Sequence, residues 1–260
     1  MTKINKHFDL FHEYHEIFFS DGIEEFSRHD LTQHQKGIDL DQSIEADIYY
    51  TNKMKESFSC QKAKLRIKKM GTNKFTPKLV LFLGNYYGSI EILAGSNGQV
   101  FFGNCGIMNL DLRVGHESHI LIGDKSTVNG AKIVAINSNV IIGRDCMVSD
   151  GVLLQAFDQH GIIDLSTREI VNKNSRGYVN LGNHVWLARN STIMPNVSIG
   201  AGSIVGAGSL VTKDVPDFSV TGGNPARVIN TGKTWSRSWM EMDRATIDFI
   251  EEHPFFKHGE

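Results

Sequence analysis

The stretch from Leu181 to Val215 places an aliphatic residue at every sixth position, and this period limits how the chain can fold. The in-phase positions are Leu181, Leu187, Ile193, Ile199, Val205 and Val211. A period of six fits neither an amphipathic helix, which repeats about every 3.6 residues, nor a half-buried strand, which alternates. It is typical of a parallel β-helix, in which each six-residue unit forms one flat side of a coil.

Three such units close one triangular turn, so residues 18 apart are predicted to stack above one another. Small residues fill the predicted corners at 200–203 and 206–209, both of which read Gly-Ala-Gly-Ser. Glycine tolerates the backbone angles that sharp corners demand. We therefore expect an all-β solenoid with three stacked pairs: Leu181 with Ile199, Leu187 with Val205, and Ile193 with Val211.

The composition is that of an ordinary folded protein. The 260 residues are 40% hydrophobic with a formal net charge of −2, which gives no sign of nucleic-acid binding by bulk charge. No apolar run approaches the ~20 residues that span a bilayer, and the N-terminus lacks the pattern of a secretion signal. The cysteines have no metal-ligand spacing and suit a reducing compartment, so we expect a cytoplasmic protein. An alternating basic run is either a polyanion groove or an exposed strand face: Lys62, Lys64, Arg66, Lys68 and Lys69.

The repeat divides the chain into three regions. Residues 1–75 show no six-residue phase and are expected to form an N-terminal appendage and cap, with short helices over 9–19 and 21–28. Residues 76–230 are expected to hold the β-helix. Residues 231–260 are expected to form a C-terminal helical cap, with one apolar face made by Trp239, Met242, Ile247 and Ile250.

A second in-phase run ends at Leu154, where the phase breaks. Residues 155–180 do not thread as hexads and must leave the solenoid as an extruded loop. Long insertions into a regular scaffold are more often functional than decorative. His160 lies in this loop, and imidazole is the side chain that exchanges a proton near cellular pH without perturbation. His160 is therefore the first candidate for proton transfer, with Asp158 or Asp164 available to orient its ring.

The segment 181–229 reads LGNHVWLARNSTIMPNVSIGAGSIVGAGSLVTKDVPDFSVTGGNPARVI. It resembles the hexapeptide-repeat acyltransferases, above all the galactoside and maltose O-acetyltransferases and the O-acetyltransferases of capsule and sialic-acid polymers. VW after Gly-Asn, the two GAGS units, VTKDVP and GNPARV carry the resemblance. It implies a left-handed parallel β-helix, a homotrimer, acetyl-CoA as the acyl donor and no requirement for a metal. It does not cover residues 1–75 or the C-terminal helix.

The resemblance also implies which residues carry out the reaction. His160 matches the catalytic base of the family, which lies at the tip of the extruded loop. Trp186 falls at the VW position near the thioester and the acceptor. Packing of Trp186 against a neighbouring subunit is a compatible interpretation. Asp158 is a candidate for acceptor binding beside His160. Asn129 matches a polar position of the acceptor pocket in galactoside-type relatives, although an asparagine that stabilises a coil corner explains it equally well.

The implied contacts with coenzyme A lie in the last coils. Small residues such as Ala207 let the pantetheine arm lie along the backbone, while Thr212 and Lys213 match positions at the far end of coenzyme A. Arg227, in NPAR, suits its phosphates, because a forked guanidinium is a natural phosphate partner. The chain departs from the family where glycine usually follows VW and one hydrophobic residue, since here Ala188 and Arg189 follow Leu187.

These observations favour an O-acetyltransferase that moves an acetyl group from acetyl-CoA to a sugar hydroxyl of a surface polysaccharide, of the capsule or lipopolysaccharide type, or of its precursor. N-acetylation of a nucleotide-linked amino sugar is the alternative. A zinc-dependent hydratase would need three converging imidazoles. A non-catalytic assembly protein would keep the coils without binding coenzyme A. The histidines available for zinc are His116, His119, His160 and His184.

Overall fold

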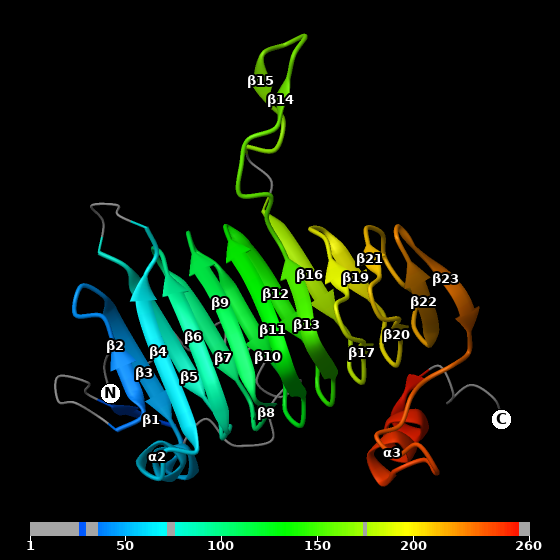
Figure 1. Ribbon diagram of the computed structural model, residues 1–260, viewed down its shortest axis with the longest axis horizontal. Coiled ribbons are helices and arrows are strands. Elements are labelled where there is room, and N and C mark those ends of the chain that lie inside the picture. Colours follow the sequence, from blue (N-terminus) through cyan, green and yellow to red (C-terminus); the bar gives the residue numbers. More distant parts are fainter. Residues whose placement is uncertain (1–25, 30–35, 72–75, 174–175, 255–260) are drawn as a thin grey trace.

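The computed structural model describes residues 26–29, 36–71, 76–173 and 176–254. They form an all-β parallel solenoid of about seven turns, built from two sheets that run its whole length (Figure 1). The eight-stranded sheet contains, in spatial order, β1 (Ser27–His29), β3 (Glu45–Tyr50), β5 (Lys78–Leu83), β7 (Gly98–Phe102), β10 (His119–Ile122), β12 (Ser138–Ile142), β16 (Gly177–Leu181) and β19 (Val197–Ile199).

The thirteen-stranded sheet wraps the rest of each coil. Its strands are β2 (Ile38–Leu40), β4 (Ala63–Lys69), β6 (Gly88–Ala94), β8 (Gly106–Ile107), β9 (Asn109–Gly115), β11 (Thr127–Ile136), β13 (Met147–Gln155), β17 (Trp186–Leu187), β18 (Thr192–Ile193), β20 (Ile204–Val205), β21 (Leu210–Val211), β22 (Ser219–Gly223) and β23 (Ala226–Thr231).

The thirteen-stranded sheet is folded into two faces, which makes the solenoid three-sided. The first part of β13 pairs with β17, and its last part pairs with β18. Between them Gly151 has a φ of +69°, and a Cβ there would collide with the side chain of Asn190. We call the side that contains β17 and β20 the Trp186 face, and the side that contains β18 and β21 the Ile193 face.

The predicted stacking of the C-terminal coils is confirmed. Leu181 pairs with Ile199, Leu187 with Val205, and Ile193 with Val211. All six side chains are buried in one continuous core. Burying a side chain of this size contributes roughly 1.5–3 kcal/mol, so the stacked columns hold successive coils in register.

The solenoid begins earlier than the sequence indicated, because β2 and β4 already lie in the thirteen-stranded sheet. Residues 38–69 are therefore coils and not an appendage that ends near residue 75. The early coils lack the six-residue phase because they are longer: Ile122 pairs with Ile142, 20 residues away. The expected helix over 9–19 lies outside the described residues. Within 21–28, the described residues are Phe26, which has no regular structure, and Ser27 and Arg28, which belong to strand β1 and not to a helix.

Lys64, Arg66 and Lys68 of the alternating basic run form the exposed face of β4, as the strand interpretation predicts, while Lys62 precedes the strand. Arg66 pairs with Asp39 and Glu91, and Lys68 also pairs with Glu91. Between β3 and β4, the helix α2 (Asn52–Ser59) buries two side chains in the core, Met54 and Phe58.

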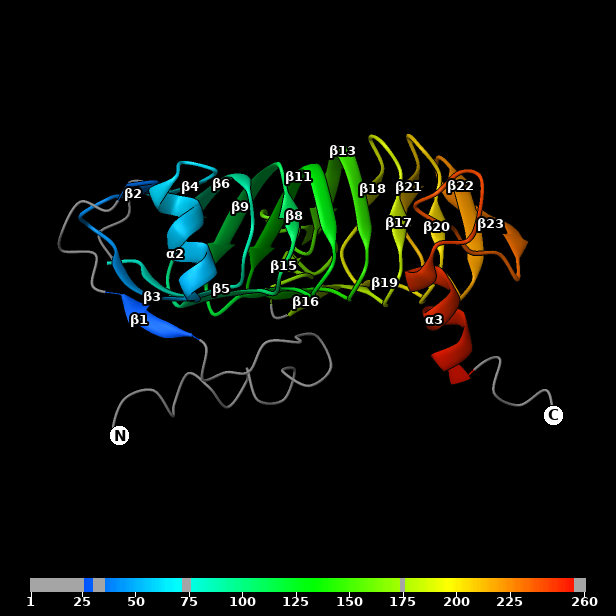
Figure 2. The ribbon, with the colours of Figure 1, turned by 90° about the horizontal axis from the view of Figure 1, so that it is seen from below.

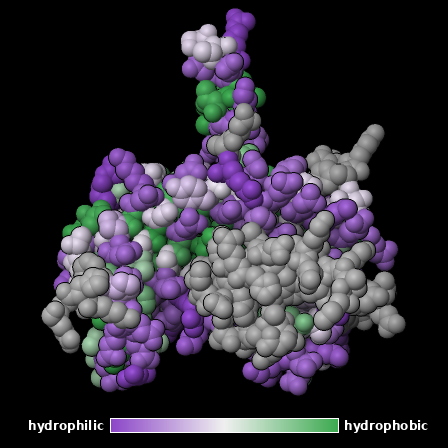
Figure 3. All heavy atoms as spheres, turned by 180° about the vertical axis from the view of Figure 1, so that it is seen from behind, coloured by the Kyte–Doolittle hydropathy of each residue, from purple (hydrophilic) through white to green (hydrophobic). Residues whose placement is uncertain are grey.

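The loop predicted over 155–180 does leave the solenoid, but it is shorter than expected, because 177–180 belong to β16 and pair with β12. The chain departs at the end of β13 and returns at Gly177, and between them β14 (Ile163–Asp164) and β15 (Glu169–Ile170) form a small hairpin. We call residues 156–176 the excursion. It projects far from the coils and carries hydrophobic side chains on its surface (Figures 1 and 3).

The C-terminal helix is shorter than expected. α3 (Arg244–Glu252) begins after Asp243, whose side chain accepts a hydrogen bond from the Thr246 amide. Trp239 and Met242 precede the helix and are exposed, so they do not share a helical face with Ile247. The helix packs beside the solenoid, where Phe249 stacks on His184 with ring centroids 4.6 Å apart (Figure 2). At the last coil, the antiparallel pair β22–β23 ends the thirteen-stranded sheet.

Candidate active site

Turns at equivalent places in successive coils stack into three edges. The His184 edge lies between the eight-stranded sheet and the Trp186 face and contains Lys125, Asp145, His184, Gly202 and Phe218, which all have positive φ angles. The Gly208 edge separates the Trp186 and Ile193 faces and contains Gly130, Gly151, Asn190 and Gly208. The Lys213 edge follows β18 and β21 and contains residues 194–196 and 212–214.

The excursion leaves from the Lys213 edge and carries His160 before its hairpin, not at its tip as the resemblance implies. The His160 amide donates a hydrogen bond to the Asp158 carbonyl (2.7 Å). The Asn172 side chain donates to the His160 carbonyl (2.9 Å) and to the Asp158 carboxylate (3.3 Å). These bonds hold the main chain around His160, while its imidazole is exposed and makes no hydrogen bond to any described residue. The main chain at His160 is therefore held in place, while its imidazole ring stays available for proton transfer.

The tip of the excursion is a tight turn organised by Asp164. Its carboxylate accepts hydrogen bonds from the amides of Ser166 and Thr167 and from the Ser166 hydroxyl. The Ser166 hydroxyl, followed by the two amides, lowers the pKa of Asp164. Asp164 therefore serves the turn and does not orient the imidazole of His160.

Trp186 lies half-buried on the Trp186 face, beside the C-terminal segment. Its indole nitrogen donates to the Ser149 hydroxyl (3.4 Å), and its ring centroid is 6.3 Å from that of Trp235. Since α3 and the excursion project from opposite sides of the solenoid, Trp186 and His160 of one chain are not brought together (Figure 1).

A polar cluster at the His184 edge holds the C-terminal segment beside Trp186. His184 is fully buried, and its Nδ1 and Nε2 atoms lie 2.8 Å from the Asp145 carboxylate and 2.9 Å from the Trp235 carbonyl. Arg237 binds the same carboxylate (2.8 Å) and lies over the Trp235 ring. Burial alone would raise the pKa of Asp145, but the hydrogen bonds from His184 and Arg237 outweigh it and hold the pKa below its usual value. Sequence reasoning missed this cluster, because its members are up to 92 residues apart.

The remaining candidate residues fall on two different edges. Asn129 and Ala207 are exposed at the Gly208 edge, and Arg227 lies next to it, because Arg227 pairs with Gly222 in the β22–β23 hairpin. Thr212 and Lys213 are exposed at the Lys213 edge, from which the excursion departs in an earlier coil. One group is thus Asn129, Trp186, Ala207 and Arg227, and the other is Asp158, His160, Thr212 and Lys213.

The residues that depart from the family pattern lie at an exposed corner. Arg189 lies at the Gly208 edge and forms an exposed ion pair with Asp150 (3.4 Å). A Cβ at Gly208 would meet no atom within 4 Å, so the backbone next to Ala207 is open to a ligand.

The four histidines considered for zinc lie in separate environments. His184 is bound by Asp145 and Trp235, His116 lies 3.1 Å from the Ser96 hydroxyl, and His119 lies beside Arg176. In the part of the chain that the structure describes, no three His, Cys, Asp or Glu side chains gather as a metal site.

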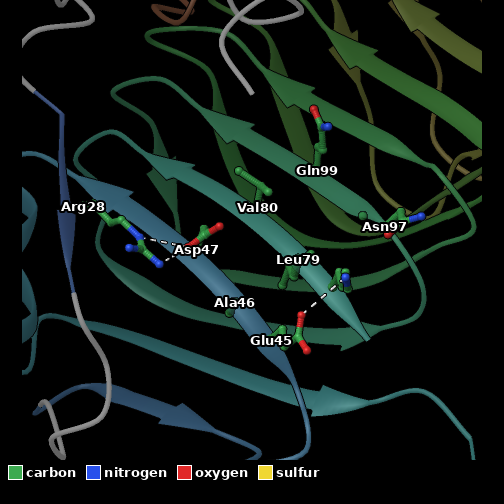
Figure 4. A pocket seen from close by; sticks show the side chains of 10 residues that line it. Arg28, Glu45, Ala46, Asp47, Leu79, Val80, Asn97 and Gln99 are labelled. Carbon is green, nitrogen blue, oxygen red and sulfur yellow. Dashed lines mark hydrogen bonds and ion pairs between the residues drawn. The ribbon is translucent and has the colours of Figure 1, made fainter. Parts of the chain in front are cut away.

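A hollow of about 630 Å³ lies at the N-terminal coils and contains none of the predicted site residues (Figure 4). Its charges pair with one another: Arg28 with Asp47, and Lys78 with Glu45 at 3.6 Å. These pairs neutralise the charged side chains that line the hollow, so among the described residues it offers no uncompensated charge to an anionic substrate.

Residues 178–213 match the family described as bacterial transferase hexapeptide (six repeats). Over 122 residues the chain is 36% identical to the polysialic acid O-acetyltransferase of Escherichia coli O1:K1 / APEC. The aligned segment covers 46% of this chain and 39% of that protein. Over 130 residues it is 30% identical to the galactoside O-acetyltransferase of Escherichia coli (strain K12), and this aligned segment covers 44% of this chain and 64% of that protein. The chain thus spans less than two thirds of either relative.

Solved structures share the fold over most of the chain. The polySia-specific acetyltransferase NeuO superposes with a TM-score of 0.63 at 26% identity, over 83% of this chain and 94% of that one. The polysialic acid O-acetyltransferase OatWY superposes with a TM-score of 0.60 at 23% identity, over 82% and 94%. Neither α2 nor α3, the helices among the described residues, has the length or apolar character to cross a bilayer.

Proposed function

Because this chain carries the hexapeptide repeat of bacterial transferases on a solenoid shared with NeuO, we propose that it is an acetyl-CoA-dependent O-acetyltransferase. The proposed acceptor is a sugar hydroxyl of a capsule-type or lipopolysaccharide-type glycan, or of its precursor. Two relatives support a sugar acceptor, since they are named for polysialic acid and for galactosides. Acetyl-CoA is a cytoplasmic metabolite, so the reaction is proposed to take place in the cytoplasm.

The proposed reaction needs one base, and His160 is suited to that role. Its imidazole removes the proton of the acceptor hydroxyl while the oxygen attacks the thioester carbonyl. The tetrahedral intermediate then expels the thiolate of coenzyme A, which receives the proton back from the imidazolium. General-base catalysis of this kind contributes roughly 10²–10⁴-fold. Backbone amides at a coil corner would stabilise the oxyanion, worth about another 10²–10³-fold.

The single observation that carries the proposed arrangement of the active site is the division of the candidate residues between two sides of the solenoid. Asp158, His160, Thr212 and Lys213 lie on the Lys213 side, and Trp186, Ala207 and Arg227 lie on the other. A ring in which each copy meets the next head-to-tail brings one such side against the other. We therefore propose a homotrimer whose active sites lie between copies, with His160 of one copy facing Trp186 of the next.

The residues around Ala207 fit coenzyme A. The exposed corner leaves backbone groups within reach of an extended pantetheine arm, which needs close approach and hydrogen-bond partners. Arg227 donates one hydrogen bond to the Ala226 carbonyl (2.8 Å), and its exposed guanidinium keeps further donors for phosphate. The exposed ammonium of Lys213 would add a second cation from the neighbouring copy.

The proposal is tested by thiol release from acetyl-CoA in the presence of purified glycans and nucleotide sugars, with the product treated with mild alkali. An O-acetyl ester is lost in alkali, whereas an N-acetyl amide survives. Thiol release that depends on a glycan and yields an alkali-labile product supports the proposal. An alkali-stable product would assign the chain to N-acetylation, and the absence of release with every acceptor would contradict the transferase assignment.

A further inference from the structure

The hairpin of the excursion exposes an unusual amount of apolar surface. Leu165 at its tip is 89% exposed, and Ile162, Ile163, Ile170 and Val171 are also exposed. A two-stranded hairpin that stands alone in water is marginally stable at best, because it has no core of its own. Large exposed apolar side chains that cluster in this way mark an interaction surface. The hairpin therefore needs a partner surface (Figure 3).

A second exposed apolar cluster lies on the opposite side of the same chain. In the turn before α3, Trp239 is 92% exposed, and Met240 and Met242 are also exposed. The turn is held on both sides, because Arg237 is bound to Asp145 and the Asp243 carboxylate accepts a hydrogen bond from the Ser236 hydroxyl. We call residues 238–242 the Trp239 turn. It is a fixed surface that faces solvent with three large hydrophobic side chains.

The hairpin and the Trp239 turn start from the same level of the solenoid. Arg237, next to the turn, bonds to Asp145 just before β13 and to the Thr127 hydroxyl (3.1 Å) at the start of β11. The excursion leaves from the end of β13. Copies arranged around an axis parallel to the solenoid differ only by rotation, so surfaces at the same level are the ones that meet.

We infer that the hairpin of one copy, residues 162–171, docks on the Trp239 turn of the next copy. This inference rests on the ring proposed above and names the surfaces that close it. The contact is heterologous, since two different patches meet, and it repeats around the ring until the ring closes. Trp186 lies beside Trp235, four residues before Trp239, so a docked excursion and Trp186 would lie on the same side of the next copy.

The first test is the mass of the assembly in solution. Sedimentation velocity is measured for Leu165→Asp, for Trp239→Asp and for Arg66→Ser, an exposed substitution far from both patches. Both aspartate variants are expected to dissociate at micromolar concentration, while Arg66→Ser keeps the mass of the unchanged protein. Because both substituted side chains are exposed, far-ultraviolet circular dichroism should be unchanged. Retention of the full assembly by both aspartate variants would overturn the inference.

Cross-linking tests the pairing of the two surfaces directly. Cys60 is exposed and is replaced by serine, whereas Cys105 and Cys146 are buried and stay in place. Burial raises the pKa of Cys146 to about 12 and raises that of Cys105 as well, so neither thiol reacts with maleimide at neutral pH. Chains with Leu165→Cys and chains with Met240→Cys, which carry different tags, are co-expressed and treated with a short bis-maleimide.

Covalent dimers that contain both tags are expected, and the matched pair of Leu165→Cys with Arg66→Cys should give none. Equal cross-linking in both pairs would contradict the docking. If the protein binds phosphatidylglycerol vesicles through the Trp239 turn and Leu165→Asp leaves the mass of the assembly unchanged, the apolar surface binds a lipid bilayer. That result would also overturn the inference. Neither experiment measures acetyl transfer, so an inactive protein with the expected cross-link would reject the proposed function alone.

Discussion

His160 and Trp186 stand on opposite sides of the same solenoid. His160 lies on an excursion from the Lys213 edge, and Trp186 lies 6.3 Å from Trp235, in the segment that leads to α3. Each has surroundings that hold it in place: Asn172 fixes the main chain at His160, and Ser149 accepts the indole hydrogen of Trp186. A reaction that uses both residues therefore needs two copies of the chain.

Replacing the proposed base should abolish transfer without unfolding the protein. For His160→Ala we expect a loss of roughly 10²–10⁴-fold in kcat, because no other imidazole lies in the excursion. The melting temperature should be unchanged, since the side chain is exposed and makes no hydrogen bond to any described residue. His116→Ala, another exposed histidine, is the control and should retain full activity. Near-native turnover by His160→Ala would show that another group acts as the base.

The cation at the Lys213 edge should act on the donor. We expect Lys213→Ala to raise the KM for acetyl-CoA about 5- to 20-fold while changing kcat less, because a lost phosphate contact weakens binding more than it affects the transition state. Steady-state kinetics at varied acetyl-CoA provide the measurement. Lys64→Ala, an exposed lysine of the N-terminal coils, should leave both constants unchanged. An unchanged KM in Lys213→Ala would remove this residue from the donor site.

Substitutions of two adjacent residues in β17 should have separate effects, one on stability and the other on turnover. Leu187 points into the core between Val148 and Val205, so Leu187→Ala should lower the free energy of unfolding by about 2–5 kcal/mol. Trp186 points outward, so Trp186→Ala should cost roughly 1 kcal/mol but strongly reduce turnover. Urea denaturation and thiol release measure the two effects. A Trp186→Ala variant that loses stability and keeps its turnover would reverse the assignment.

The Asp145 carboxylate should make stability depend on acid pH. Its pKa is lowered in the folded protein, so its contribution is complete above the unfolded value of about 3.9 and is lost as the pH falls through the folded pKa. Asp145→Ala leaves His184 and Arg237 without their acceptor and should cost about 1–3 kcal/mol at pH 7. The difference from the unchanged protein should shrink below about pH 4.

Chemical denaturation between pH 3 and pH 7 tests this dependence. Asp39→Ala removes an exposed carboxylate that pairs with Arg66, and it should change stability by less than about 1 kcal/mol at every pH. A difference between Asp145→Ala and the unchanged protein that grew on acidification would be opposite in sign to the expected linkage.

The regular coils could be predicted from the sequence because their period is constant. Leu181 pairs with Ile199, one 18-residue turn away, and one aliphatic residue per side is enough to set the register. The N-terminal coils could not, since their turns have other lengths; Ile122 pairs with Ile142 at a separation of 20, and Ile67 with Ile92 at 25. An inward-outward alternation remains in each strand, but it does not show which strands stack.

The candidate residues could be named from the sequence, but their placement could not. The motif that contains Trp186 and the interruption of the repeat that contains His160 are local sequence signals. The distance between the two residues depends instead on the edge of the solenoid at which each one lies. The start of α3 did have a local signal, since Asp243 is a favoured helix N-cap residue and Trp239 precedes it. The Asp145–His184 pair had none, because its partners come from different coils.

Mixed assemblies give the most direct test of a site divided between two copies. His160→Ala chains and Trp186→Ala chains are each expected to be inactive alone. Co-expressed in equal amounts, they should recover about a quarter of the activity of the unchanged protein, because most random trimers contain both chains and each of these has one site with both residues intact. Activity no greater than the sum of the two separate variants would contradict the account, because it would place His160 and Trp186 of the same chain in one site.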